Sequence, residues 1–327
     1  MIRCAMEGAH KARSPHPVRA TTSLLYVYGY VPGISDAQLI CETIAVLSAF
    51  AYVLGMGPLE RFIEDRLIQG QATFSREEAE AVLDLTKQTL TASLVRLAKR
   101  KRLASPRKGF FLILRPEEQS AGAPDPAQWI DPLMRALSLD YRVSLLRAAA
   151  SHGSSHQAAM VFQVIVPRQL LGIELGRHRI EFVYQAPASF ARVNQPEALD
   201  KIKTSAGYAR VAGVELTLLD CVRYFHKAGG INNVAQVVKD IGDKADPRKL
   251  ATLATAYESS CVRRLGYLLE RTGHDRQAKR LETFAHKAKT AVPLDPRVKE
   301  VSSVLSTLAD KDARWKLLIN QRVEVDF

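Results

Sequence analysis

The sequence predicts an α+β protein in which an N-terminal winged helix-turn-helix domain precedes a larger mixed α/β domain. Three helical patterns and a hairpin pattern follow one another over residues 56–114, and helix and strand patterns mix over residues 132–327. Residues 115–131, rich in proline and in acidic and small residues, are predicted as a linker. The 327 residues, 47% of them hydrophobic, are enough for two cores.

The charge of the chain is positive and unevenly distributed. The net charge is +12 and the pI is near 9.6, which favours an anionic partner. The stretch Thr86–Gly109 alone holds eight Lys or Arg residues and no acidic residue. We therefore expect the anionic partner to bind this part of the chain.

Residues 1–55 form an N-terminal extension with two interpretations. Residues 1–36 are polar and punctuated by proline and glycine, which predicts little stable structure, whereas residues 37–54 have the pattern of an apolar helix. Met56 then opens a segment with the pattern of a domain start. The extension is either the product of a misassigned start codon or a genuine helix that packs against the rest.

The cysteines and apolar runs favour a cytoplasmic protein. The four cysteines lie far apart and form no CxxC pair, as expected for free thiols in a reducing compartment; they are Cys4, Cys41, Cys221 and Cys261. The longest apolar run, Thr43–Met56, has 14 residues, which is too short to span a bilayer. We expect no membrane partner.

Local signals place the first two helices of the winged helix. Apolar residues at helical spacing mark the first helix, namely Leu59, Phe62, Ile63 and Leu67. Ser75 and Glu78 form a capping box, in which each side chain accepts a bond from a free backbone N–H at a helix start. The apolar side of this second helix is expected to consist of Ala79, Val82 and Leu83.

The third helix is predicted from its cap, Thr86, to about Lys101. At 100° per residue, its two sides differ in character. The apolar side holds Leu90, Leu94, Leu97 and Ala98, and the opposite side holds Gln88, Ala92, Arg96 and Lys99. A recognition helix requires this division, because one side packs on the scaffold while the other enters the major groove of DNA. A hairpin over 103–114 follows as the wing.

Each candidate DNA-binding residue has a role that follows from its chemistry. Gln88 can pair with adenine and Arg96 with guanine through two hydrogen bonds each, worth about 1–3 kcal/mol of discrimination. Ala92 leaves room for close approach, and Lys87 and Thr89 in the first turn can reach bases or phosphates. Phosphate contacts are expected from Lys99, Arg100, Lys101 and Arg102, and contacts of the wing tip with the backbone or minor groove from Arg107 and Lys108.

A basic amphipathic helix is more often a solvated face than a DNA reader. Here the capping box, the three-residue connection Asp84–Thr86 and the basic wing that ends at Gly109 favour DNA binding. The connection lacks the glycine that is frequent in such turns. The sequence therefore predicts double-stranded DNA as the partner.

Periodicity predicts a mixture of elements in the larger domain. Helices are expected at Trp129–Leu139, Tyr141–Ser151, Val214–Phe225, Asn232–Ile241, Pro247–Ala256, Ser259–Arg271 and Asp275–Lys289. Strands are expected at Val161–Val166, Gly172–Leu175, Arg179–Tyr184 and Arg314–Val325. Asp220 and Arg223, one turn apart, are expected to form an ion pair within their helix.

Several of these segments resemble one family, in order and spacing. They are Tyr141–Gln157, Val161–Val166, Arg177–Val183, Val214–Tyr224, Gly229–Val234, Arg264–Glu270 and Arg314–Phe327. Over residues 57–327 the chain resembles the AbiEi-type antitoxins of type IV toxin–antitoxin systems.

The resemblance implies a transcriptional autorepressor whose winged helix binds inverted repeats in its own promoter. The DNA-binding role then falls, by place in the motif, on Lys87, Gln88, Arg96, Arg107 and Lys108. The resemblance also implies that residues 132–327 counteract a nucleotidyltransferase-type toxin, without requiring a tight complex between the two proteins.

No catalytic, metal-binding or cofactor-binding residue is assigned from the sequence. The pair His152 and His156 is better explained as polar capping at a helix end, because Gly153 separates the two and no HExxH glutamate is present. Gly153–Ser154 is similar to the start of a nucleotidyltransferase site, but no DxD pair follows. Two alternatives stay open: a metal-dependent nuclease or nucleic-acid-modifying enzyme targeted by the winged helix, and a scaffold whose winged helix binds protein.

Overall fold

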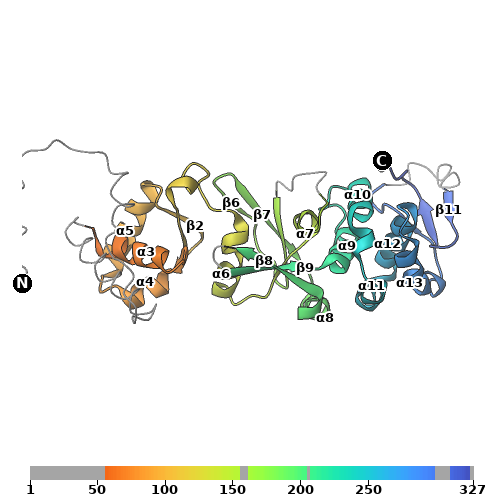
Figure 1. Ribbon diagram of the computed structural model, residues 1–327, viewed down its shortest axis with the longest axis horizontal. Helices are drawn as coiled ribbons and strands as arrows, with labels where there is room; N and C mark the ends of the chain where they lie inside the picture. The colour runs from red at the N-terminus through yellow and green to blue at the C-terminus, as the bar shows by residue number, and fades with distance from the viewer. Residues whose placement is uncertain (1–55, 155–160, 205–206, 299–309, 325–327) are drawn as a thin grey trace, which may run out of the picture. The chain divides into compact units, whose positions relative to one another are not determined.

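The computed structural model describes residues 56–154, 161–204, 207–298 and 310–324 (Figure 1). The chain divides into two units, Met1–Met56 and Gly57–Phe327. The expectations for residues 1–55, together with Cys4, Cys41 and His156, lie outside the described residues.

Residues 57–114 fold into three helices and a three-stranded antiparallel sheet, coloured orange to yellow in Figure 1. The helices are α3 (Pro58–Ile68), α4 (Arg76–Val82) and α5 (Lys87–Lys99). The sheet has the order β1-β3-β2, with β1 (Thr73–Ser75), β3 (Phe110–Ile113) and β2 (Leu103–Arg107). Strand β1 is not predicted from the sequence, because three residues are too few to show a period.

The predicted caps form in this segment. The backbone N–H of Glu78 donates to the Ser75 hydroxyl at 3.0 Å, and the N–H of Ser75 donates to the Glu78 carboxylate at 2.8 Å. At α5, the N–H of Thr89 donates to the Thr86 hydroxyl at 3.2 Å. The helix ends at Lys99 rather than Lys101, because Lys101 has a φ of 54°, a left-handed conformation that ends a helix.

The core of residues 57–114 matches the predicted apolar sides with two exceptions. Leu59, Phe62 and Ile63 from α3 pack with Leu90, Leu94 and Leu97 from α5. Val82, however, is 68% exposed, because α4 ends at this residue and has only Ala79 buried. Ala98 is also exposed, in the last turn of α5, where the chain leaves the helix.

The predicted linker is shorter than expected. Residues 116–118 form a 3-10 turn, but α6 (Pro126–Ala136) begins within the segment. Pro126 is the first residue of α6, capped by the Asp125 carboxylate, so this proline starts a helix instead of marking a loop. Trp129 is buried, and its indole N–H donates to the carbonyl of Pro124 at 3.1 Å.

A six-stranded mixed sheet follows, in the order β6-β7-β5-β4-β9-β8. Its strands are β4 (Arg142–Val143), β5 (Val161–Val166), β6 (Ile173–Leu175), β7 (His178–Tyr184), β8 (Leu199–Thr204) and β9 (Gly207–Ala212). Strands β5 and β7 pair in parallel. Strand β4 lies between β5 and β9; it pairs antiparallel with β5 and parallel with β9. The sequence predicts β5, β6 and β7 but neither β8 nor β9.

The predicted helix Tyr141–Ser151 is wrong in its first part. Arg142–Val143 is strand β4, and α7 (Leu145–Ser151) starts only afterwards. The apolar spacing of this segment fits a helix. Arg142 and Val143 nevertheless form a strand of the sheet, where both side chains are buried. Pairing with distant strands overrides the local period.

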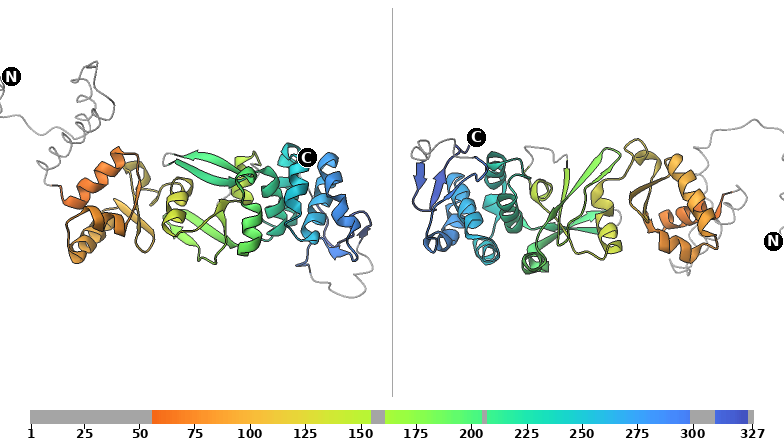
Figure 2. Two further views of the ribbon diagram at one scale, coloured as in Figure 1. Left: turned by 90° about the horizontal axis from the view of Figure 1, so that it is seen from below. Right: turned by 180° about the vertical axis from the view of Figure 1, so that it is seen from behind.

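Helices complete the domain, and α12 and α13 lie side by side (Figures 1 and 2). They are α8 (Pro187–Val193), α9 (Val214–Arg223), α10 (Ile231–Ile241), α11 (Pro247–Ala254), α12 (Ser259–Arg271) and α13 (Asp275–His286). A small tail sheet contains β10 (Val292–Pro293), β11 (Asp310–Asp312) and β12 (Leu317–Ile319). Helices α9 to α13 all have predicted counterparts.

Candidate nucleic-acid interface

Helix α5 presents the predicted polar side to solvent. Gln88, Arg96 and Lys99 are exposed, and so is Ala92 between them, whereas Leu90, Leu94 and Leu97 on the opposite side are buried. The core of residues 57–114 therefore holds one side of α5 and leaves the other free to approach a partner.

Arg76 connects α4 to α5. Its guanidinium donates to the Thr91 hydroxyl at 2.8 Å and to the Lys87 carbonyl at 3.3 Å, while its Nε pairs with Glu80 at 2.8 Å. The backbone N–H of Arg76 also donates to the Gly109 carbonyl at 2.7 Å. One residue thus ties together both helices and the hairpin turn, which holds α5 at a set angle.

The four consecutive cations after α5 are not equivalent. Arg100 lies 3.6 Å from Glu60, and Arg102 lies 2.5 Å from Glu64, so both pair with carboxylates of α3. Lys99 and Lys101 are exposed and form no ion pair with other residues in the described ranges. Of the four residues predicted to contact phosphates, these two lysines are the ones whose charges are not paired with a carboxylate in the described ranges.

The two cations of the hairpin tip differ in their contacts. Lys108 is exposed, but Arg107 donates to the Leu171 carbonyl and its guanidinium lies 5.8 Å from the centre of the Phe182 ring. Leu171 precedes β6 and Phe182 lies on β7. Arg107 therefore connects the hairpin to the six-stranded sheet and its loops, a contact that the sequence does not predict.

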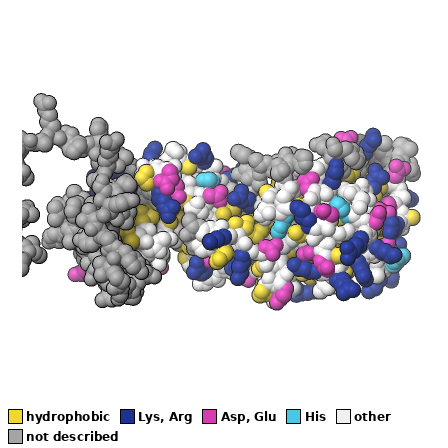
Figure 3. Space-filling view, in the orientation of Figure 1, with side chains coloured by type: hydrophobic (Ala, Val, Ile, Leu, Met, Phe, Trp, Pro, Cys, Tyr) yellow, Lys and Arg dark blue, Asp and Glu magenta, His cyan; other side chains and the backbone are white. Residues whose placement is uncertain are grey.

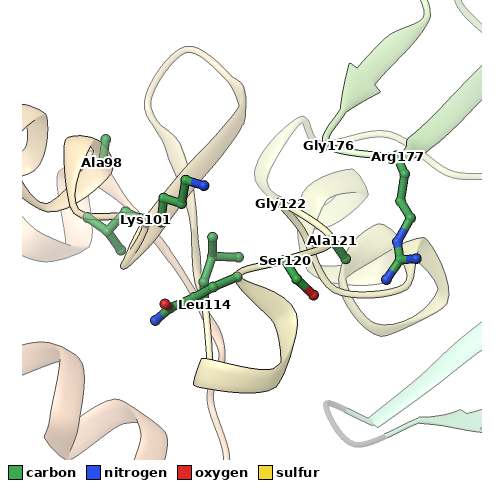
Figure 4. Close-up of a pocket in the computed structure, with 10 residues that line it drawn as sticks. Ala98, Lys101, Leu114, Ser120, Ala121, Gly122, Gly176 and Arg177 are labelled. Atoms are coloured by element: carbon green, nitrogen blue, oxygen red, sulfur yellow. The ribbon is translucent and has the colours of Figure 1, made fainter.

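A pocket of about 480 Å³ lies beside the end of α5 (Figure 4). Lys101 and Arg177 lie on opposite sides of it, with Leu114 and Ser120 between them. Its floor depends on a close backbone contact, because a Cβ on Gly176 would lie only 2.0 Å from the Ala121 carbonyl oxygen. Two cations thus flank an open recess beside the C-terminal end of α5.

In the larger domain, the side chain of Arg142 is fully buried and paired with Asp220. Its Nε and Nη2 each donate to one oxygen of the Asp220 carboxylate at 2.9 Å, and Nη2 also donates to Gln185 at 2.6 Å. Arg223 instead pairs with Glu258 at 2.9 Å. The predicted ion pair within α9 is wrong, because Asp220 points into the core while Arg223 points to the surface.

Hydroxyl groups complete the surroundings of Asp220. Ser144 donates to one carboxylate oxygen and Tyr257 to the other, both at 2.7 Å. Burial alone would lower the pKa of Arg142, but the neighbouring Asp220 outweighs it and the pKa is raised. The network joins β4, α9 and the segment between α11 and α12 through a charge pair that is already satisfied, so it has the character of a structural core rather than a reactive site.

Residues 142–271 match the AbiEi antitoxin C-terminal domain family. We call this matched segment the AbiEi domain. The match begins at the buried Arg142 and includes Asp220 and Tyr257, so the whole network lies inside the AbiEi domain. Over residues 142–271 the resemblance stated from the sequence is confirmed, and with it an antitoxin role in a toxin–antitoxin system.

The comparison with solved structures extends the shared fold beyond the AbiEi domain. The chain is similar to the RV2827C protein from Mycobacterium tuberculosis, with a TM-score of 0.54 and 15% sequence identity over 79% of this chain and 89% of that chain. At this identity the likeness shows the fold alone. No curated protein sequence matches the chain.

Other polar side chains of the AbiEi domain pair with one another or cap helices. Gln163 on β5 lies opposite Glu181 on β7 and donates to it at 3.2 Å, while Lys227 pairs with the same carboxylate at 2.5 Å. His152 ends α7 as its C-cap, and its ring lies 2.7 Å from the Ala212 carbonyl. Among the residues that the structure describes, no group of three or more His, Cys, Asp or Glu is placed to hold a metal ion.

Within the described ranges, no helix is long and apolar enough to cross a membrane. Cys221 and Cys261 are free and buried, and burial raises the pKa of the Cys261 thiol to about 12.

Proposed function

We propose that the chain is a sequence-specific autorepressor as well as an antitoxin, and that residues 57–114 are its winged helix-turn-helix domain. The observation that carries the proposal is the exposed side of α5, where Gln88, Arg96 and Lys99 surround the small Ala92. In this proposal α5 lies in the major groove of the protein's own promoter, at inverted repeats.

The residues divide into those that read bases and those that hold phosphates. Gln88 and Arg96 have side chains suited to adenine and guanine. Lys87, Lys99, Lys101 and Lys108 are exposed lysines around them and bind the DNA backbone. Arg100 and Arg102 contribute less to DNA binding, because their charges are already paired with Glu60 and Glu64. Thr89 contributes less than the lysines, since its backbone N–H and its hydroxyl both contact the Thr86 hydroxyl.

A gel-shift series with the full chain tests DNA binding. Wild-type protein should bind its own promoter more tightly than a scrambled duplex of equal length, and Gln88→Ala/Arg96→Ala should remove most of that preference. Thr252→Ala, an exposed substitution on α11, serves as the control and should behave as wild type. Equal binding of the promoter and the scrambled duplex by wild-type protein would refute the proposal.

The second half of the proposal concerns the toxin, which we take to be a nucleotidyltransferase-type enzyme encoded next to this chain. Counteracting it requires no catalytic residue in the AbiEi domain, and it takes place in the cytoplasm together with repression. Co-expression of the adjacent reading frame should arrest growth, and this chain should restore growth. Gln88→Ala/Arg96→Ala should restore it equally well, because antitoxicity is assigned to the other domain. A growth arrest that this chain does not relieve would remove this half of the proposal while leaving DNA binding intact.

A further inference from the structure

The open recess beside the C-terminal end of α5 has the dimensions of a ligand site (Figure 4). Its volume of about 480 Å³ lies within the range of sites that hold small molecules, roughly 300–1,000 Å³. Its lining comes from the end of α5, the hairpin that follows, segment 119–122, and the turn between β6 and β7. We call it the α5 recess; its lining includes Lys101, Leu114, Ser120, Gly176 and Arg177.

Backbone contacts fix the shape of the recess on the side away from α5. The N–H of Arg177 donates to the Ala121 carbonyl at 3.0 Å. Gly122 and Gly176 have left-handed φ values of 77° and 57°, and a Cβ on Gly122 would lie 2.8 Å from the Cα of Gly176. Glycine is the residue that permits both this conformation and this approach. The recess is therefore formed before any ligand binds, which lowers the cost of ordering it.

Lys101 stands at a position where glycine would fit with less strain. Its φ of 54° is left-handed, and its backbone N–H closes the end of α5 by donating to the Ala98 carbonyl at 3.0 Å. Non-glycine residues in this conformation concentrate at functional sites. What lysine adds here is a charged side chain, which lies at one side of the recess opposite Arg177 (Figure 4).

The α5 recess differs from the rest of the surface in its lack of acidic groups. Figure 3 shows Lys and Arg side chains spread over the described part of one face, with Asp and Glu side chains among them. None of the described residues that line the recess is acidic. Lys101 and Arg177 are exposed, and neither forms an ion pair with another residue of the described ranges. Two carboxylates nearby in the sequence are engaged elsewhere: Glu118 accepts a backbone N–H bond at 2.9 Å, and Glu174 lies 3.7 Å from Arg179.

The groups around the recess are suited to phosphate. A guanidinium presents N–H donors in a planar fork that matches phosphate oxygens, and an ammonium binds phosphate as a point charge. The Ser120 hydroxyl and the Gln119 amide add donors, and neither side chain hydrogen-bonds to another residue that the structure describes. No aromatic ring belongs to the described lining, so a nucleic-acid base has nothing to stack on there. The chemistry favours a small phosphorylated molecule over a nucleic-acid strand.

We propose that the α5 recess binds a small phosphorylated metabolite, whose phosphate groups are held by Lys101 and Arg177. Lys101 is also one of the lysines assigned to the DNA backbone under the proposed function, so the ligand and the promoter share one cation. On that assignment, which rests on the proposed function, the bound ligand weakens promoter binding, and the promoter weakens ligand binding by the same factor.

Calorimetric titration of the full chain with inorganic pyrophosphate, without divalent cations, tests the site directly. Wild-type protein should bind one pyrophosphate in the recess, and Lys101→Gln/Arg177→Gln should weaken that binding at least ~10-fold, because each substitution removes a charge-assisted hydrogen bond. The matched control is Arg168→Gln/Lys201→Gln, which removes the same charge from exposed positions outside the recess and should stay within about two-fold of wild type. If the double variant does not fold by circular dichroism, Lys101→Gly/Arg177→Gln replaces it, since glycine suits the φ at position 101.

A gel shift with the promoter, at matched ionic strength, tests the coupling. Saturating pyrophosphate should weaken promoter binding by wild-type protein by ~5-fold or more, and should leave Arg177→Gln unchanged, because that variant keeps Lys101 but no longer holds the ligand. If wild-type protein shows no preference for the promoter yet binds pyrophosphate through Lys101 and Arg177, the recess stands and the autorepressor proposal falls.

Two results would overturn the inference. One is a Lys101→Gln/Arg177→Gln variant that binds pyrophosphate as tightly as its control, which would place the anion elsewhere on the chain. The other is wild-type protein that binds no pyrophosphate while Arg177→Gln weakens promoter binding, which would make the recess part of the DNA interface. Promoter binding that is insensitive to bound pyrophosphate would overturn the coupling.

Discussion

Removal of Arg142 should destabilise the AbiEi domain more than any surface substitution. In Arg142→Met, the carboxylate of Asp220 stays buried with only the hydroxyls of Ser144 and Tyr257 as partners, and Gln185 loses its donor. Leaving one partner of a buried pair uncompensated costs about 3–5 kcal/mol. Since domains of ordinary stability unfold with about 5–15 kcal/mol, this is a large fraction of the total.

The double variant Arg142→Met/Asp220→Leu shows whether the charge or the packing is responsible. It removes both charges and keeps apolar volume at both positions, so it should lose much less stability than the sum of the two single variants. Urea unfolding followed by circular dichroism and by the fluorescence of the buried Trp129 and Trp315 measures all four proteins. A loss below about 1 kcal/mol for Arg142→Met, or a double variant as unstable as the sum, would refute the role assigned to the pair.

Three further predictions concern single positions. Gly266→Ala should destabilise the protein by at least about 1–3 kcal/mol in the same urea assay, because a Cβ there would lie 2.0 Å from the ring of the buried Trp315; an unchanged midpoint would show that the tail does not pack as described. Lys101→Gly should raise the free energy of unfolding by up to about 1 kcal/mol, since glycine adopts the φ of 54° without strain. The same variant should bind DNA more weakly, because it lacks the lysine charge. If it binds DNA as tightly as wild type, Lys101 is not part of the interface. Burial raises the pKa of the Glu181 carboxyl, but the bonds from Lys227 and Gln163 outweigh burial and the pKa is lowered; the stability this ion pair adds is therefore complete above the ordinary carboxyl pKa of about 4.3 and disappears as the pH falls through the lower folded value. Glu181→Gln should accordingly reduce the loss of stability on acidification, and identical pH profiles for the two proteins would contradict this.

The exposed side of α5 was predictable because it depends on local information. The Thr86 cap, the leucine spacing and the opposite polar side all lie within residues 86–99, and a helix turns such a pattern directly into two faces. The same holds for α12, whose bounds Ser259–Arg271 agree with the prediction. The family resemblance was available for a related reason, since it depends on the order of such local segments.

The partners of charged residues were not predictable in this way. Asp220 has Arg223 one turn away, but its actual partner, Arg142, is 78 positions earlier in the chain. Likewise, sequence places Arg107 on a free wing, whereas the fold brings Leu171 and Phe182 to it. In each case the choice of partner depends on which strands lie next to each other.

Sequence alone thus determined the helices, their caps and the faces they expose, because these depend on neighbours within one or two turns. Tertiary structure alone decided which of these cations are neutralised: Arg100 and Arg102 by carboxylates of α3, and Arg142 by Asp220. The physical reason is that an ion pair requires two groups within a few ångströms, and only the folded chain sets the distances between residues that are far apart in sequence.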